Sequence, residues 1–167
     1  PAPALTFAEL NLPAPLEQQI ESNKWETPSP IQAVSIPVAL AGRDLIGIAK
    51  TGSGKTAAYL LPALFHIQRQ PKIERGDGPI VLILAPTREL AQQVDEVASD
   101  FCPRINCRHC CLFGGSGRGP QIAELRRSPA LVVATPGRLI DFMTQEIVTM
   151  ERVNFLVLDE ADRMLDM

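Results

Sequence analysis

The stretch AKTGSGKT, which starts at Ala49, combines residue types that bind phosphate. Gly52 and Gly54 let the backbone curl so that successive N–H groups face phosphate oxygens. Lys55 adds a positive charge for the β- and γ-phosphates, and the Thr56 hydroxyl can bind Mg²⁺. The usual phosphate-loop pattern has glycine where this chain has Ala49, but a plain glycine turn does not need a Lys-Thr pair. The stretch therefore predicts a nucleoside triphosphate site.

A second set of chemical groups stands in FLVLDEAD, where an apolar run ends in Asp159 and Glu160. Ligands of open α/β sheets bind at the carboxyl ends of strands, where these two side chains would lie. Asp159 suits Mg²⁺, and Glu160 can orient or deprotonate the water that attacks a γ-phosphate. The two acids could instead form a solvated helix start that complements the helix dipole. A phosphate loop in the same chain favours the catalytic interpretation.

Short apolar runs that alternate with amphipathic stretches position these groups. Three runs are nearly continuous in Val, Ile and Leu, which predicts parallel strands covered on both faces. The alternation of strands and helices predicts an α/β fold in which the phosphate loop follows a strand and opens a helix. We expect strands at residues 44–49, 80–86, 109–115, 131–136 and 155–162, and helices at 56–70, 88–101 and 137–145.

Length and composition limit the possible functions. The chain has 167 residues, of which 46% are hydrophobic and 21% charged, as expected for one globular domain. Its net charge of -3 and pI of about 5.4 exclude a global basic field, so any nucleic-acid contact must be local. The sequence contains no leader-like start and no apolar run of membrane-spanning length, which favours an intracellular location.

Four cysteines and a histidine crowd into FCPRINCRHCC, a composition that invites a zinc site. The spacing argues against one, because the adjacent Cys110 and Cys111 would point to opposite faces of a strand. We expect buried or half-buried reduced thiols at Cys102, Cys107, Cys110 and Cys111.

Six motifs in order give the chain a close resemblance to the DEAD-box RNA helicases: WETPSPIQ, AKTGSGKT, APTRELA, GG, TPGR and DEAD. The resemblance implies the first of two RecA-like domains, a P-loop NTPase with a mostly parallel sheet flanked by helices. It implies dependence on ATP and Mg²⁺ and a substrate of single-stranded or locally opened RNA. It also implies catalytic roles for Lys55, Asp159 and Glu160, and metal binding by Thr56 and Asp159.

The resemblance further predicts that the domain is incomplete. The sequence ends at RMLDM, whereas the family continues with a Ser-Ala-Thr motif on a further strand and then a second domain that supplies arginines. We expect residues 13–167 to form the N-terminal RecA-like domain without its C-terminal strands, after a loosely ordered segment at 1–12. The missing strand would leave a gap inside the sheet, and this piece alone should show neither RNA-stimulated ATPase activity nor unwinding.

Gln32 in WETPSPIQ has two possible roles. With Ser29 and Pro30 it forms a helix-start pattern, in which the Gln32 side chain reaches back to the cap. The resemblance instead makes Gln32 the adenine reader, with Phe7 on the adenine face or, alternatively, in the core. The family usually has Gly at Lys24 and Thr at Ser29. The nucleotide contacts implied by the resemblance are Phe7, Trp25, Gln32, Thr51, Gly52, Ser53, Gly54, Lys55 and Thr56.

PTREL and TPGR each follow an apolar strand and open a helix with an Arg in the first turn. Helix starts present free N–H groups and a positive dipole end, so both can hold RNA phosphates. Alternatively, the two arginines only cap or bridge helices. Contacts of this kind predict that the protein binds RNA in preference to DNA and has little preference for the sequence of the RNA. The expected RNA-binding residues are Pro86, Thr87, Arg88, Gly114, Gly115, Thr135, Pro136, Gly137 and Arg138.

Two classes of function fit these motifs. One is an enzyme that couples ATP hydrolysis to RNA unwinding or remodelling, and the other is an ATP-gated RNA clamp with negligible turnover. Intact Lys55, Thr56, Asp159 and Glu160 favour the enzyme, and Gln32 with the DEAD tetrad disfavours a DNA helicase or a generic NTPase. The strings ERGDGPI, GPQIAEL and VLDEADRMLDM resemble the mostly nuclear subgroup, so we expect a nuclear rather than a cytoplasmic protein. Separately, we expect the protein to be a monomer.

Overall fold

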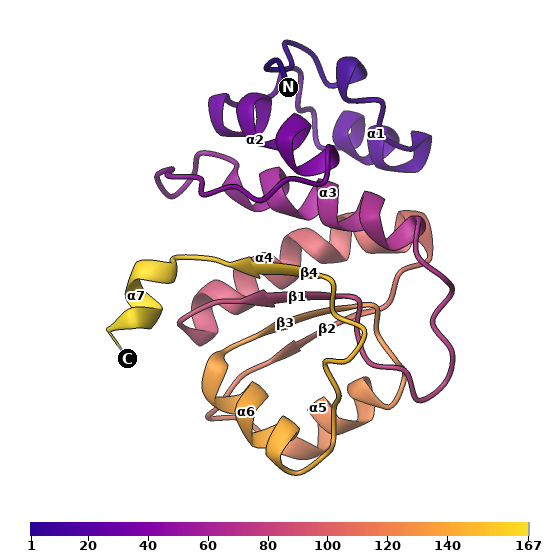
Figure 1. Ribbon diagram of the computed structural model, residues 1–167, viewed down its shortest axis with the longest axis vertical. Coiled ribbons are helices and arrows are strands. Elements are labelled where there is room, and N and C mark those ends of the chain that lie inside the picture. The colour runs from indigo at the N-terminus through magenta and orange to yellow at the C-terminus, as the bar shows by residue number, and fades with distance from the viewer. Residues whose placement is uncertain (167) are drawn as a thin grey trace. The chain divides into compact units, whose positions relative to one another are not determined.

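The computed structural model describes residues 1–166, which divide into two compact units. The first unit, Pro1–Gln70, is helical, and the second, which begins at Pro71, holds a β-sheet (Figure 1). The first unit contains the 3₁₀ helix η1 (Ala8–Leu10) and the α-helices α1 (Ala14–Ser22), α2 (Pro30–Leu40) and α3 (Lys55–Gln68).

Apolar side chains on one stripe of each helix build the first unit. Leu16 and Ile20 of α1 and Ile36 of α2 are buried, and α2 lies against α3. The segment before α1 contributes as well, since Phe7 is buried and the Ala4 N–H donates to the Ala33 carbonyl oxygen at 2.9 Å. The expectation that residues 1–12 are loosely ordered stays a prediction, because burial does not measure motion.

The second unit contains four parallel strands in the order β2-β3-β1-β4. The central strand β1 pairs in register with β3 and β4, so that Val81 lies opposite Leu131 and Phe155. This sheet with its connecting helices confirms the predicted α/β fold. The strands are β1 (Val81–Leu84), β2 (His109–Leu112), β3 (Leu131–Ala134) and β4 (Phe155–Leu158). The helices are α4 (Arg88–Phe101), η2 (Cys102–Ile105), α5 (Arg118–Leu125), α6 (Pro136–Thr144) and α7 (Ala161–Leu165).

The strand predicted at residues 44–49 does not form. Ile46 is 95% exposed and Ile48 94% exposed, and none of the described residues pairs with this segment as a strand. A strand forms only where a neighbouring strand accepts and donates its backbone hydrogen bonds. An apolar sequence does not by itself provide that neighbouring strand. The prediction of a strand before the phosphate loop is therefore wrong for this structure, whereas the helix after the loop is present.

The strands differ in how well they are covered. All residues of β3 and nearly all of β1 are buried, as their runs of Val, Ile and Leu predict. In β4 alternate side chains are exposed, with Leu156 at 57% and Leu158 at 51%. The expectation that this run is covered on both faces is wrong, because one face of β4 leaves Leu156 and Leu158 exposed. Among the described residues, β4 pairs with β1 alone and lies at an edge of the sheet.

The parallel arrangement brings the carboxyl ends of all four strands to one edge of the sheet. Thr87 follows β1 and precedes α4, Thr135 joins β3 to α6, and Asp159 follows β4. This edge therefore collects the motif residues of the second unit. Among the described residues, no helix is long and apolar enough to cross a membrane.

Candidate nucleotide loop and nucleic-acid interface

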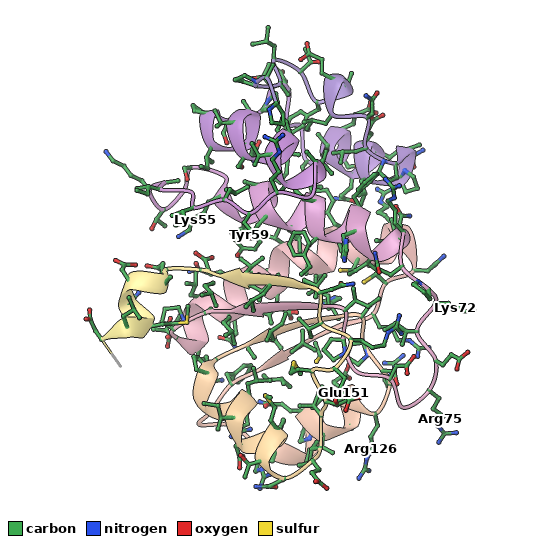
Figure 2. All side chains as sticks on the ribbon, viewed as in Figure 1. Lys55, Tyr59, Lys72, Arg75, Arg126 and Glu151 are labelled. Atoms are coloured by element: carbon green, nitrogen blue, oxygen red, sulfur yellow. The ribbon has the colours of Figure 1, made fainter. Side chains whose placement is uncertain are left out.

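In the first unit, the phosphate loop has the backbone shape that its glycines predict. Gly52 and Gly54 have φ angles of 82° and 83°, in the left-handed region that other residues rarely adopt. The Ser53 N–H donates to the Lys50 carbonyl oxygen at 3.1 Å and closes the turn. Gly54 then caps α3, whose first helical residue is Lys55 (Figure 2). The loop thus leads directly into a helix N-terminus, where unpaired N–H groups favour an anion.

The side chains around this loop fit a phosphate ligand. Lys55 and Thr56 are half-buried in the first turn of α3, and Thr51 and Gly52 are exposed. The Ser53 hydroxyl oxygen is buried and has no hydrogen-bond partner among the described residues. A buried hydroxyl without a partner costs free energy, so the loop holds a polar group that a bound ligand can satisfy.

Gln32 joins the start of α2 to the end of the phosphate loop. Its side chain is buried, its Oε1 accepts from the Ser29 N–H at 3.0 Å, and its Nε2 donates to the Gly54 carbonyl oxygen at 3.1 Å. The first bond confirms the predicted helix-start role, with Ser29 as cap and Pro30 at the first helical position. The adenine-reader role stays a prediction.

The other expected base contacts lie in the same unit. Phe7 is 8% exposed, as a core aromatic would be, and Trp25 is half-buried with its backbone N–H bonded to the Ile20 carbonyl oxygen at 3.2 Å. Lys24 has a φ of 60°, so the residue that replaces the usual glycine sits in a left-handed turn. Their roles toward adenine stay predictions.

In the second unit, the acidic pair stands where the strand pattern predicts. Asp159 follows β4, is 5% exposed, and donates its N–H to the Leu84 carbonyl oxygen of β1 at 2.9 Å. Glu160 has a left-handed backbone with a φ of 50° and caps the short helix α7. Its carboxylate lies 3.4 Å from the Arg163 guanidinium. Glu160 therefore occupies a helix start, and its catalytic role stays a prediction.

The two expected phosphate-binding helix starts share one edge of the sheet. Thr87 caps α4, and its hydroxyl accepts from the Leu90 N–H at 3.2 Å, while Pro86 before it is buried. Thr135 caps α6 and donates its N–H to the Leu112 carbonyl oxygen at 2.9 Å. Pro136 occupies the first turn of α6, where its missing N–H costs nothing.

The structure brings Arg88 and Arg138 to one loop, residues 113–116. The Arg88 guanidinium stacks over the Phe113 ring, 4.5 Å from its centroid. Arg138 donates to the Gln121 Oε1 at 3.0 Å and to the Ser116 carbonyl oxygen at 3.2 Å. The two arginines thus contact the first and last residues of the loop that contains the glycine pair.

Gln121 in α5 forms hydrogen bonds with the same loop through both the nitrogen and the oxygen of its side-chain amide. It donates to the Phe113 carbonyl oxygen at 3.0 Å and accepts from the Phe113 N–H at 3.4 Å. Gly114 and Gly115 beyond it are exposed, as is Gly137 in α6, and Gly115 has a φ of 75°. Sequence reasoning missed Gln121 and Phe113. Phe113 adjoins the glycine pair, and Gln121 lies in the string GPQIAEL, but that string gave no sign of the contact with the loop, which exists only in the folded chain.

The cysteine segment forms η2 and β2. Cys110 is buried and Cys111 half-buried on alternate faces of β2, as the adjacent positions predict. Burial raises the pKa of the Cys111 thiol to about 12 and that of Cys110 further. His109 Nδ1 lies 2.7 Å from Asp95 Oδ1. Within the described residues, no three His, Cys, Asp or Glu side chains are placed to hold a metal ion.

Comparison with known proteins supports the motif analysis. A sequence model of the DEAD/DEAH box helicases matches residues 29–167. The chain is 54% identical over its full length to DEAD-box ATP-dependent RNA helicase 30 of Arabidopsis thaliana and 50% identical to ATP-dependent RNA helicase DBP2 of Candida albicans. It spans 28% and 30% of those relatives, so it corresponds to less than a third of their length.

A solved structure has the same fold. The crystal structure of the RNA helicase Prp28 from Chaetomium thermophilum bound to ADP superposes with a TM-score of 0.93 at 42% sequence identity. The match covers 99% of this chain and 41% of that one.

Proposed function

The chain belongs to the DEAD/DEAH box helicase family, and on that premise we propose that it is part of an ATP-dependent RNA helicase or RNA-remodelling ATPase. The observation that carries the proposal is the phosphate loop. Two left-handed glycines shape it, α3 begins directly after it, and the buried Ser53 hydroxyl within it has no partner among the described residues. These features fit a nucleotide phosphate better than an empty turn.

In this proposal the loop residues bind the triphosphate and the acidic pair acts on the reaction. Lys55 contacts the β- and γ-phosphates through its ammonium group. Thr56 and Asp159 would hold Mg²⁺, which when bound neutralises charge on the phosphate oxygens. Glu160 orients the attacking water and takes its proton. Its contact with Arg163 is a partly exposed ion pair at 3.4 Å, which is weak enough for the carboxylate to leave.

Adenine recognition would use Gln32, Phe7 and Trp25. A side-chain amide has two donor hydrogens and two acceptor lone pairs, and the two bonds within the chain use one of each. Gln32 therefore keeps one donor and one acceptor for the base edge without leaving the loop. The ADP in the Prp28 crystal structure is consistent with an adenine nucleotide here.

RNA would bind along the edge of the sheet that carries both helix starts. The N-termini of α4 and α6 offer backbone N–H groups, and Arg88 and Arg138 add charge at the two ends of the glycine loop. Both guanidiniums also have protein contacts, which hold them in place and lower the entropy lost on binding. The remaining expected contacts are Pro86, Thr87, Gly114, Gly115, Thr135, Pro136 and Gly137.

The decisive experiment is phosphate release by the full-length protein with and without single-stranded RNA. An ATPase gives turnover that rises with RNA and disappears in Glu160→Gln. Tight ATP-dependent RNA binding with no turnover in either form would instead establish the clamp. We further propose that a second RecA-like domain is the partner of this one. We also propose that the protein is a monomer, which gel filtration can test, and that it is located in the nucleus, which fluorescence microscopy can test.

A further inference from the structure

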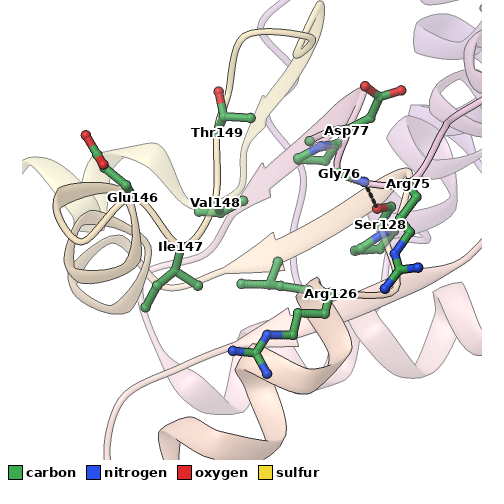
Figure 3. A pocket seen from close by; sticks show the side chains of 13 residues that line it. Arg75, Gly76, Asp77, Arg126, Ser128, Glu146, Ile147, Val148 and Thr149 are labelled. Atoms are coloured by element: carbon green, nitrogen blue, oxygen red, sulfur yellow. Dashed lines mark hydrogen bonds between the residues drawn. The ribbon is translucent and has the colours of Figure 1, made fainter.

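A hollow of about 360 Å³ lies within the second unit, where three loops converge (Figure 3). Its walls are residues 75–79 before β1, the turn around Ser128 before β3, and residues 146–149 between α6 and β4. Because the four strands are parallel, these loops share the amino-terminal edge of the sheet. The residues proposed for RNA in this unit lie at the carboxyl edge, so the amino-edge hollow is a separate feature.

The walls of the amino-edge hollow are fixed by their own contacts. The Gly76 N–H donates to the Ser128 hydroxyl at 3.1 Å, and Asp77 pairs with Arg152 at 2.9 Å. A Cβ at Gly78 would collide with the Thr149 carbonyl oxygen, so only glycine lets these two walls meet. A ligand would therefore find the hollow already formed, and little ordering free energy opposes binding.

The hollow offers an apolar floor beside unpaired backbone. Leu125 is 8% exposed, and Ile147 and Val148 are partly buried against the core under β3 and α6. The N–H groups of Val148 and Thr149 donate to no group in the part of the chain that is described. An extended segment can pair with such backbone groups while alternate side chains cover the floor.

The charges at the rim are uneven. Arg75 and Arg126 are exposed on two different walls, and neither guanidinium forms an ion pair or hydrogen bond with a described residue. Glu146 stands at the other end of the hollow (Figure 3). Carboxylates are complementary to the arginine end, whereas an evenly charged nucleic-acid backbone would also place phosphate beside Glu146.

We propose that the amino-edge hollow docks an extended acidic segment of a partner protein. Asp or Glu side chains of that segment pair with Arg75 and Arg126, and an apolar side chain between them lies over Leu125 and Ile147. The volume accommodates a few side chains, which suits a short linear segment rather than a folded domain.

The test is selection of phage-displayed random 12-residue peptides on the full-length protein. We expect enrichment of sequences in which Asp or Glu flank apolar residues. A synthetic peptide of the enriched sequence, carrying fluorescein, should lose about tenfold or more in affinity when Arg75→Ala and Arg126→Ala are combined. The control combines Lys72→Ala with Arg127→Ala, which removes the same charge from exposed sites outside the hollow and should leave the affinity unchanged.

A charge-reversal variant provides a second test of the same two arginines. Selection on the Arg75→Glu, Arg126→Glu variant should no longer enrich acidic peptides. Enrichment without acidic residues, or acidic peptides that bind the double alanine variant undiminished, would overturn the proposal. Fluorescein-labelled oligo(U) that binds the double alanine variant more weakly than the control would show a nucleic-acid site instead. RNA-stimulated ATPase activity should be equal in all variants, which separates this outcome from the proposed function.

Discussion

Gln32 and Gly54 are held together by a hydrogen bond of 3.1 Å between the side-chain amide and the backbone carbonyl oxygen. A Cβ at Gly54 would lie 2.5 Å from that amide nitrogen. The helix start at Ser29 and the phosphate loop are therefore linked through one buried side chain.

The first prediction concerns Gly54→Ala. The added methyl group meets both a left-handed φ of 83° and the Gln32 amide, so we expect loss of ATP binding and destabilisation by about 1–3 kcal/mol. The matched control is Gly42→Ala, where φ is 76° but no atom lies within 4 Å of the new Cβ. Isothermal titration measures ATP affinity, and thermal unfolding measures stability. Gly42→Ala reports the effect of backbone strain alone, and Gly54→Ala reports the effect of strain together with the collision. Equal ATP affinity in both variants would show that the contact is unimportant.

The second prediction concerns Gln32→Glu. A carboxylate keeps the size of the side chain but cannot donate to the Gly54 carbonyl oxygen, and it offers adenine no donor. We expect roughly tenfold or greater loss of ATP affinity and a smaller preference for ATP over GTP, measured with fluorescent nucleotide analogues in the full-length protein. The exposed Gln18→Glu serves as the charge control. An unchanged preference for ATP would remove Gln32 from base recognition.

The third prediction separates binding from catalysis in the full-length protein. Lys55→Ala should abolish nucleotide binding because Lys55 contacts the ground-state phosphates. Glu160→Gln should bind ATP nearly normally but hydrolyse it orders of magnitude more slowly, because Glu160 acts on the attacking water. Titration calorimetry and single-turnover phosphate release give the two quantities. The division of roles fails if both variants lose ATP affinity equally.

The fourth prediction concerns the RNA edge. Arg88→Ala and Arg138→Ala should each weaken RNA binding to a similar degree for all sequences and lower the salt slope of log Kd by about 1. Lys72→Ala, which removes an exposed cation from the segment before β1, is the control. Fluorescence anisotropy at several salt concentrations measures both effects. A loss restricted to some RNA sequences would indicate base contacts instead.

The fifth prediction concerns alkaline stability. Burial raises the pKa of Cys111 from about 9 to about 12, so the unfolded chain loses this proton at a lower pH than the folded chain does. This contribution to stability is complete below pH 9 and is lost as pH rises toward 12, by up to about 1.4 kcal/mol per pH unit. Urea unfolding between pH 8 and 11 should show a shallower decline for Cys111→Ala. Parallel curves would contradict the raised pKa.

Local signals allowed much of this fold to be predicted from sequence. Helix α4 begins and ends where its pattern predicts, because Thr87 is a strong cap and the apolar stripe is regular. Residues 44–49 failed because strand formation depends on a pairing partner, which local sequence does not encode. Gln121 was missed for a related reason, since an amide that bonds to a loop eight residues away in sequence has no periodic signature.

The left-handed turn at Lys24 bears on mutational robustness. An L-residue at a φ of 60° gives up roughly 1 kcal/mol relative to glycine, the residue that the family usually has there. The substitution Lys24→Gly should therefore raise the free energy of unfolding by a similar amount. A chain with that substitution tolerates one further mildly destabilising change elsewhere, so the residue at this single position affects which other substitutions the protein can accept.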